Sequence, residues 1–198
     1  MTALKLLNNE TERQIAVGRK MSARNSTDIV SQTINNERTT VIVGDSITKN
    51  VQGIKLAKAV GHRVVTKPFP DATIRDMPSH VVPTIEPPGQ VCLHAGTNDL
   101  KSSTSSDAAD GIIDLAIEDG NDSESEIFIS ELTARNDDYC DFVKAVNICV
   151  KKFCQQNNWK LISHANVSSK GLNKGNLHLS GEGNELLEQN FVNFLRSN

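Results

Sequence analysis

Short runs of apolar, mostly β-branched residues alternate along the chain with segments in which apolar residues recur at helical spacing. Five runs are continuous enough in apolar residues to indicate strands covered on both faces, and they lie at residues 39–44, 62–66, 90–95, 126–130 and 159–163. The segments between and after them predict helices, the last with Ser180 as its N-cap. This alternation predicts a five-stranded parallel sheet in a three-layer α/β/α sandwich, with ligands bound outside the carboxyl ends of the strands.

The first 38 residues follow neither pattern. Their Ser, Asn, Thr and Gln content predicts a polar tail or linker with a short helix near residues 15–21, so the folded domain is expected at residues 39–198. No stretch of the chain approaches the ~18 consecutive apolar residues of a membrane helix. Residues 3–7 also fall short of the apolar core of a secretory signal. The sequence therefore predicts a cytoplasmic protein without a membrane partner.

Charge and composition narrow the partners further. The chain carries a net charge of -3, and the six basic and four acidic residues of the first 38 leave the expected domain at -5. With only 4% aromatic residues, the domain has neither the basic field nor the stacking rings of a nucleic-acid binder. The four cysteines form no Cys-x-x-Cys pair and the five histidines are scattered, so we expect reduced thiols, a buried Cys92, no metal and no cofactor.

Three polar residues occupy the positions where a parallel sheet presents its ligand. Ser46 directly follows the first strand in the motif Gly-Asp-Ser, Asn98 follows the third strand in Gly-Thr-Asn-Asp, and His178 precedes the last helix. Each alone has an ordinary structural explanation, as a helix N-cap, a polar turn and a surface histidine. Together they form an arrangement with a known chemical purpose, in which a serine is presented at the top of the sheet and the Asn98 amide supplies a neutral donor of the kind that stabilises an oxyanion.

The combination resembles the SGNH, or GDSL-type, hydrolases, whose first, second, third and fifth sequence blocks are similar to residues 44–46, 69–73, 96–99 and 177–180. The resemblance implies a flavodoxin-like fold and a serine esterase acting on a small carboxylic ester. It assigns Ser46 as nucleophile and His178 as its base. The oxyanion hole would combine the backbone N–H groups of Ser46 and Asp71 with the Asn98 amide.

The sequence is similar in more detail to the SGNH domains that LINE-type retrotransposons encode in animal genomes. Those domains share Gly-Asp-Ser-x-x-Lys-Asn-Val, here residues 44–51, and His-x-Gly-Thr-Asn-Asp-Leu, here residues 94–100.

Gly96, Arg135 and Asn136 are further candidates for the pocket, because they lie on the same rim of the predicted sheet. A structural Arg-Asp turn is the alternative explanation for the Arg-Asn-Asp sequence.

Two positions depart from the family pattern. Asp71 stands where the second block has glycine, and Gly175 stands where the triad acid belongs, with no carboxylate between Asp141 and Glu182. We therefore expect a Ser-His dyad, with the histidine oriented by a main-chain carbonyl of residues 173–175 or by the side chain of Asn173 or Asn176. The same departures leave a second hypothesis open, a catalytically weak or inactive domain that acts as a binding or retroelement-derived module.

Overall fold

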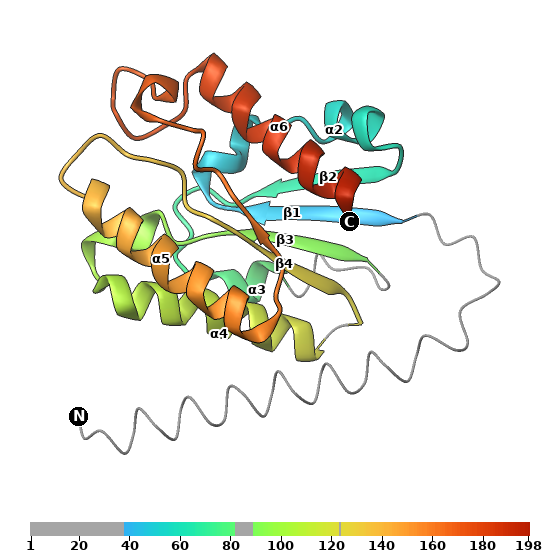
Figure 1. The fold of residues 1–198 in the computed structure, drawn as a ribbon, viewed down its shortest axis with the longest axis horizontal. Coiled ribbons are helices and arrows are strands. Elements are labelled where there is room, and N and C mark those ends of the chain that lie inside the picture. The colour runs from blue at the N-terminus through green and yellow to red at the C-terminus, as the bar shows by residue number, and fades with distance from the viewer. Residues whose placement is uncertain (1–37, 82–88, 123) are drawn as a thin grey trace. The chain divides into compact units, whose positions relative to one another are not determined.

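The computed structural model of the protein describes residues 38–81, 89–122 and 124–198. These residues form a five-stranded parallel sheet in the order β2-β1-β3-β4-β5 (Figure 1). The strands are β1 (Thr39–Gly44), β2 (Arg63–Pro68), β3 (Gln90–His94), β4 (Glu126–Ser130) and β5 (Leu161–Ile162). The helices are α2 (Gly53–Val60), α3 (Met77–Val81), α4 (Ser105–Asp122), α5 (Cys140–Asn157) and α6 (Gly181–Ser197), with 3₁₀ turns η1 (Ser46–Asn50), η3 (Asn98–Lys101) and η4 (Ser169–Gly171).

The predicted fold class is confirmed, and the strands lie close to their expected positions. The main difference is β5, which has two residues where five were expected. The reason is local: the Trp159 N–H donates to the Cys154 carbonyl at 2.9 Å and stays with the end of α5 instead of joining the sheet. The tail and the short helix predicted before residue 38 lie outside the described residues.

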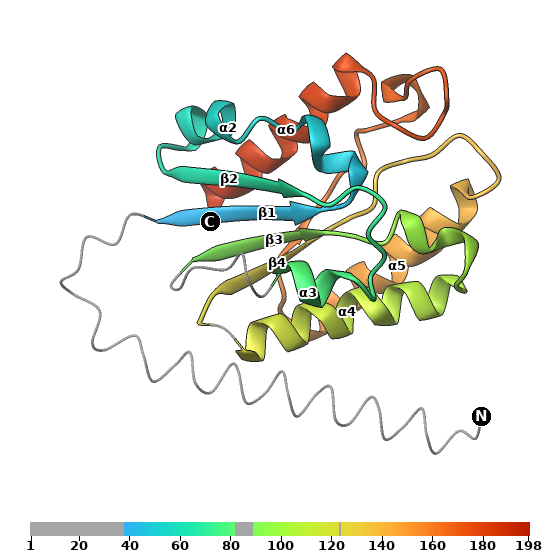
Figure 2. The ribbon, with the colours of Figure 1, turned by 180° about the vertical axis from the view of Figure 1, so that it is seen from behind.

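Two apolar cores lie on opposite faces of the sheet, as the period of two along a strand requires. Val41 and Val43 of β1 belong to the core covered by α3, α4 and α5, whereas Ile42 between them belongs to the core covered by α2 and α6. The two views in Figure 1 and Figure 2 show these helices as separate layers on either side of the strands. Cys92 is fully buried in the second core, as predicted.

The helix ends follow from local sequence. Gly61 adopts φ 81° and Asn158 φ 55°, so α2 and α5 each stop at a residue that tolerates the left-handed conformation. At the start of α6, Ser180 Oγ accepts a hydrogen bond from the Gly183 N–H at 3.2 Å. The predicted N-cap is therefore confirmed, and it fixes where the segment containing His178 enters the helix.

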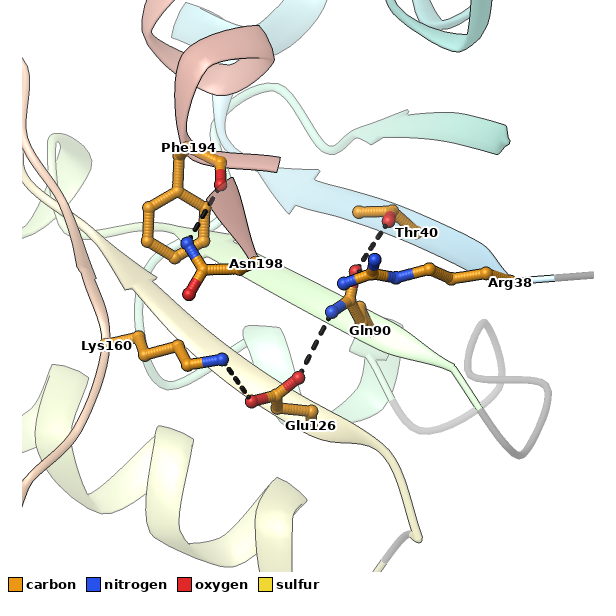
Figure 3. Close-up of polar contacts among 7 residues, drawn as sticks. All are labelled: Arg38, Thr40, Gln90, Glu126, Lys160, Phe194 and Asn198. Atoms are coloured by element: carbon orange, nitrogen blue, oxygen red, sulfur yellow. Dashed lines mark hydrogen bonds and ion pairs between the residues drawn. The ribbon is translucent and has the colours of Figure 1, made fainter. Parts of the chain in front are cut away.

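Polar side chains tie the amino ends of the strands together (Figure 3). The nearly buried Gln90 accepts from the Thr40 hydroxyl at 3.1 Å and from Arg38 Nε at 3.2 Å, and it donates to Glu126 Oε2 at 3.1 Å. Lys160 Nζ donates to Glu126 Oε1 at 2.9 Å. This ladder links β1, β3 and β4 to the residue that precedes β5.

The strand order creates a switch point between β1 and β3. After β1 the chain turns into η1 and α2 on one face of the sheet, and after β3 it turns into η3 and α4 on the other face. In a sheet of this order the diverging loops open a crevice at the carboxyl ends of these two strands. Ser46 and Asn98 each begin the turn that follows one of them.

Candidate active site

The end of β1 is shaped by Gly44 and Asp45. A Cβ atom on Gly44 would lie 2.5 Å from Thr48 Cγ2 and 2.7 Å from the His94 carbonyl oxygen, so only glycine lets η1 fold back so closely on the strand. The Asp45 carboxylate is fully buried, and its Oδ1 accepts from the Ile47 N–H at 3.0 Å. Asp45, and not Ser46, is therefore the N-cap of this turn.

Ser46 consequently has its side chain free of the capping role that was the alternative explanation for it. It is the first residue of η1 and is half-buried. Within the described part of the chain, neither its backbone N–H nor its hydroxyl makes a hydrogen bond. Both groups are thus available to a ligand at the carboxyl end of β1.

Backbone hydrogen bonds lock three loops around this serine. Asp45 Oδ2 accepts from the Thr97 N–H at 3.2 Å, which links the loop after β1 to the loop after β3. The Phe69 N–H donates to the Gly44 carbonyl at 2.8 Å and adds the loop after β2. Asn98 Nδ2 then donates to the Ala72 carbonyl at 2.9 Å, so the loops after β2 and β3 are also joined directly.

Asp99 adds a second link between the loops after β2 and β3. Its side chain is buried, and Oδ2 accepts from the Ile74 N–H at 3.0 Å. Burial raises the pKa of the Asp99 carboxyl, while the bond from Ile74 opposes that shift. Gly96, which starts the same loop, adopts φ 119°, a conformation that explains why this position is glycine.

Asp71 occupies the left-handed region with φ 65°, the condition under which a glycine would be less strained. Its side chain is exposed, and the backbone N–H makes no hydrogen bond within the described residues. Among the described residues, the Asn98 amide nitrogen makes one hydrogen bond, to the Ala72 carbonyl, so its second N–H is also unused. Ser46, Asp71 and Asn98 therefore each retain an N–H donor on one interlocked group of loops.

His178 lies on a separate loop between η4 and α6. Leu172 and Leu179 form an antiparallel bridge, and the Asn173 N–H donates to the His178 carbonyl at 2.7 Å. The loop closes through Asn176, which adopts φ 57° and donates its N–H to the Asn173 carbonyl at 3.0 Å. The imidazole itself is exposed, and no described residue forms a hydrogen bond with it, Ser46 included.

Two of the acceptors expected to orient His178, the side chains of Asn173 and Asn176, each accept a different hydrogen bond. Asn173 Oδ1 accepts from the Gly175 N–H at 2.9 Å, and Asn176 Oδ1 accepts from Asn136 Nδ2 at 3.3 Å. The Asn136 N–H also donates to the Asn176 carbonyl at 3.2 Å. Asn136 thus supports the loop that contains His178, without touching the imidazole.

The contacts of Arg135 are those of the structural Arg-Asp turn that was the alternative explanation for this sequence. The side chain is buried, and its guanidinium forms an ion pair and paired hydrogen bonds with Asp137. It also lies 5.3 Å from the centre of the Tyr139 ring, within the range of a cation–π contact. The neighbouring guanidinium lowers the pKa of the Asp137 carboxyl.

Solved structures with a similar fold are known, although no protein-family model and no curated protein matches the sequence. A lipase/acylhydrolase from Enterococcus faecalis superposes with a TM-score of 0.66 at 18% identity, over 81% of this chain and 96% of that one. A GDSL-like lipase from Bacteroides thetaiotaomicron gives 0.67 at 14% identity, over 91% and 98%. A psychrotrophic esterase from Pseudoalteromonas sp. gives 0.64 at 14% identity, over 81% and 97%. The chain has the fold of the GDSL-type lipases.

In this GDSL-type fold, a buried chain of hydrogen-bonded side chains, which the sequence analysis did not predict, lies at the carboxyl ends of β3, β4 and β5. Ser130 Oγ lies 2.9 Å from His94 Nδ1 and 2.7 Å from His164 Nε2, and all three residues are at most 2% exposed. Asn190 Nδ2 lies 3.1 Å from His164 Nδ1 and continues the chain to the surface. The only sequence signal was that His94, Ser130 and His164 each stand at or just after the end of a strand.

Two further findings concern metal ions and membranes. Across residues 38–81, 89–122 and 124–198, no group of three or more His, Cys, Asp or Glu side chains is arranged to hold a metal ion. Within the same residues, no helix combines the length and the apolar character needed to cross a membrane.

Proposed function

We propose that this protein is a serine esterase that hydrolyses small carboxylic esters. Ser46 Oγ attacks the ester carbonyl, and His178 takes the serine proton and passes it to the leaving alcohol. The backbone N–H groups of Ser46 and Asp71 and the Asn98 amide stabilise the oxyanion of the tetrahedral intermediate. Water, deprotonated by His178, then attacks the carbonyl of the acyl-enzyme, which releases the acid and regenerates Ser46.

The observation that carries this proposal is the set of unused N–H donors on the interlocked loops. Ser46 N, Asp71 N and one Asn98 amide hydrogen have no partner among the described residues. They occur beside the switch point of the sheet, in a fold similar to that of a GDSL-like lipase. Unused polar donors next to a free serine hydroxyl are what an oxyanion hole requires before substrate arrives, since each such donor contributes about 3 kcal/mol to the transition state.

Asp71 restricts the substrate class. Its carboxylate is exposed, and its negative charge on the loop that supplies an oxyanion donor would disfavour an anionic acyl group. The left-handed conformation at φ 65° costs Asp of order 1 kcal/mol more than glycine, without removing the backbone donor. Neutral, short-chain esters are the substrates that this arrangement favours.

The unpaired imidazole of His178 sets the expected level of activity. A triad acid holds the histidine in the correct tautomer, and its loss lowers kcat by up to about 10⁴. Here no described residue takes that place, since Asn173 and Asn176 are bonded elsewhere. We therefore expect slow turnover, faster than uncatalysed hydrolysis but well below that of an enzyme with a complete triad.

The test is hydrolysis of p-nitrophenyl acetate by the purified protein. The wild type should hydrolyse the ester, and S46A and H178A should each reduce the rate of hydrolysis to that of buffer alone. S197A, which removes an exposed hydroxyl at the far end of α6, is the matched control and should retain the wild-type rate. Equal rates in wild type, S46A and H178A would overturn the proposal.

A second candidate function is a catalytically inactive GDSL-type domain that acts as a binding module, including one derived from a LINE-type retroelement. The observation in its favour is that His178 has no hydrogen-bonded partner among the described residues while Gly175 occupies the position of the acid. A fluorophosphonate probe separates the two candidates, because it labels an activated serine. Failure to label Ser46 in the wild type would favour the binding module, and salt-sensitive RNA binding would support its retroelement form.

A further inference from the structure

A hollow lies between the carboxyl half of α5 and β5, and no residue of the proposed esterase site lines it. Its volume is about 330 Å³, at the small end of the range for pockets that hold organic ligands. Its lining residues come from α5, from β5 and from the segments that flank them: Glu131, Lys151, Cys154, Gln155, Asn158, Trp159, Leu161 and Ser163.

Glu131 supplies a buried carboxylate to this hollow. The residue is 8% exposed, and its Oε2 accepts from the Ser163 hydroxyl at 2.7 Å and from the His164 N–H at 3.0 Å. Its Oε1 accepts no hydrogen bond from any described residue. Glu131 lines the hollow, so this second oxygen can accept a hydrogen bond from a cationic donor that enters it.

Part of the wall of the hollow is apolar, beside the polar side chains of Gln155, Asn158 and Ser163. Trp159 stacks at a tilt against Phe153, with ring centres 5.8 Å apart, and Leu161 continues the surface along β5. Cys154 is 2% exposed, and burial, with a further contribution from the charge of Glu131, raises the pKa of its thiol to about 12. The thiol is therefore neutral at physiological pH, and it acts as a small apolar group in the wall.

Two more features set the polarity of a ligand. Lys151 lines the hollow from α5 and is exposed, so its ammonium is available to an anionic group. The carbonyls of Lys160 and Ile162 accept from β4, at 3.3 Å from Ile129 N and 2.9 Å from Glu131 N. The backbone groups of Leu161 between them therefore face the outer edge of the sheet, where they can bond a polar ligand.

We propose that this hollow binds a small zwitterion of the α-amino acid class. The ligand's ammonium pairs with Glu131 Oε1, its carboxylate lies toward Lys151, and its apolar side chain packs against Trp159 and Leu161. The two protein charges of opposite sign in one small cavity select a ligand that carries both charges, because a simple amine or a simple carboxylate leaves one of them unpaired. The site is independent of the proposed esterase chemistry.

The test uses the fluorescence of Trp159, the only tryptophan of the chain, with calorimetry as a second readout. L-leucine is titrated into the full-length protein beside 3-methylbutylamine, which lacks the carboxylate, and 4-methylpentanoate, which lacks the ammonium. L-leucine should bind saturably and at least tenfold more tightly than either analogue. Absence of a saturable signal in both readouts, or equal affinity for all three compounds, would overturn the proposal.

Charge variants assign the two ends of the ligand. E131Q should weaken L-leucine and 3-methylbutylamine at least tenfold and leave 4-methylpentanoate unchanged, whereas K151Q should weaken L-leucine and 4-methylpentanoate only. K152Q, on the next and also exposed residue of α5, is the matched control and should bind as wild type. If E131Q does not fold, the analogue series and K151Q still decide the outcome, and unchanged binding in K151Q would contradict the proposal.

Discussion

The buried chain of His94, Ser130 and His164 leads to a prediction about stability at acidic pH. Because the Asn190 amide nitrogen donates to His164 Nδ1, that ring carries its hydrogen on Nε2 and donates to Ser130. The Ser130 hydroxyl then donates to His94 Nδ1, so His94 is neutral with its hydrogen on Nε2. A proton added to either ring would set two donors against each other in a site at most 2% exposed.

The sign of the effect follows from the two pKa shifts. Burial, with a further contribution from His94, lowers the pKa of His164 well below 6.5, and burial also lowers that of His94, although the charge of Asp45 opposes the second shift. Below pH 6.5 the unfolded chain therefore takes up protons that the folded protein does not. The free energy of unfolding falls with decreasing pH by about 1.4 kcal/mol per pH unit for each ring that stays neutral, or about 2 kcal/mol between pH 6.5 and 5.0.

The measurement is urea unfolding of wild type and H164N at intervals from pH 5.0 to 7.5. H164N should be less stable than wild type at pH 7.5, because it loses the contacts of the ring with Ser130 and Phe191, but its stability should fall less steeply as the pH decreases. H178N removes a histidine from the exposed loop and is the matched control, so its pH dependence should run parallel to that of wild type. Parallel curves for wild type and H164N would refute the reasoning.

Three further predictions concern the candidate active site. G183A should lower the free energy of unfolding by about 3 kcal/mol in urea titrations, because its Cβ would lie 2.0 Å from the Gly171 carbonyl oxygen. G181A is the control: its Cβ would have nothing within 4 Å, so it should change the free energy of unfolding by less than about 1 kcal/mol, and equal losses in the two variants would contradict the prediction. D71N should raise kcat/KM several-fold for mono-p-nitrophenyl succinate relative to p-nitrophenyl acetate, and an unchanged ratio would show that the Asp71 charge does not face the ester. N136A, which frees the loop at residues 173–178, should lower kcat about fivefold, corresponding to about 1 kcal/mol, while KM and far-UV circular dichroism stay unchanged.

Much of the fold could be predicted from the sequence because its signals are local. Short, β-branched apolar runs such as residues 39–44 and 126–130 indicate strands between two layers, and the observed β1 and β4 have the same bounds. The N-cap at Ser180 is equally local, because it depends on one side chain and the first turn of a helix. The shortening of β5 was not visible, since it depends on whether Trp159 bonds to the sheet or to the end of α5.

The site shows the same division. The candidates Ser46, Asn98 and His178 can be proposed from their positions after strands and before a helix. The role of Asp45 could not, because its second partner is the N–H of Thr97, 52 residues away along the chain. The polar chain through Ser130 and the pairing of Asn136 with Asn176 are likewise contacts between distant segments, for which a single sequence carries no pattern.

The two halves of the proposed site have separate supports. The serine half is held by hydrogen bonds among residues 44–46, 69–74 and 96–99, whereas the histidine half depends on the bridge of Leu172 with Leu179 and on Asn136. Among the described residues, no hydrogen bond joins one half to the other. The oxyanion donors therefore keep their geometry whether or not the imidazole is oriented. For this reason, measurements of stability do not distinguish a slow esterase from an inactive binding domain, whereas labelling of Ser46, which needs a base at the serine, does.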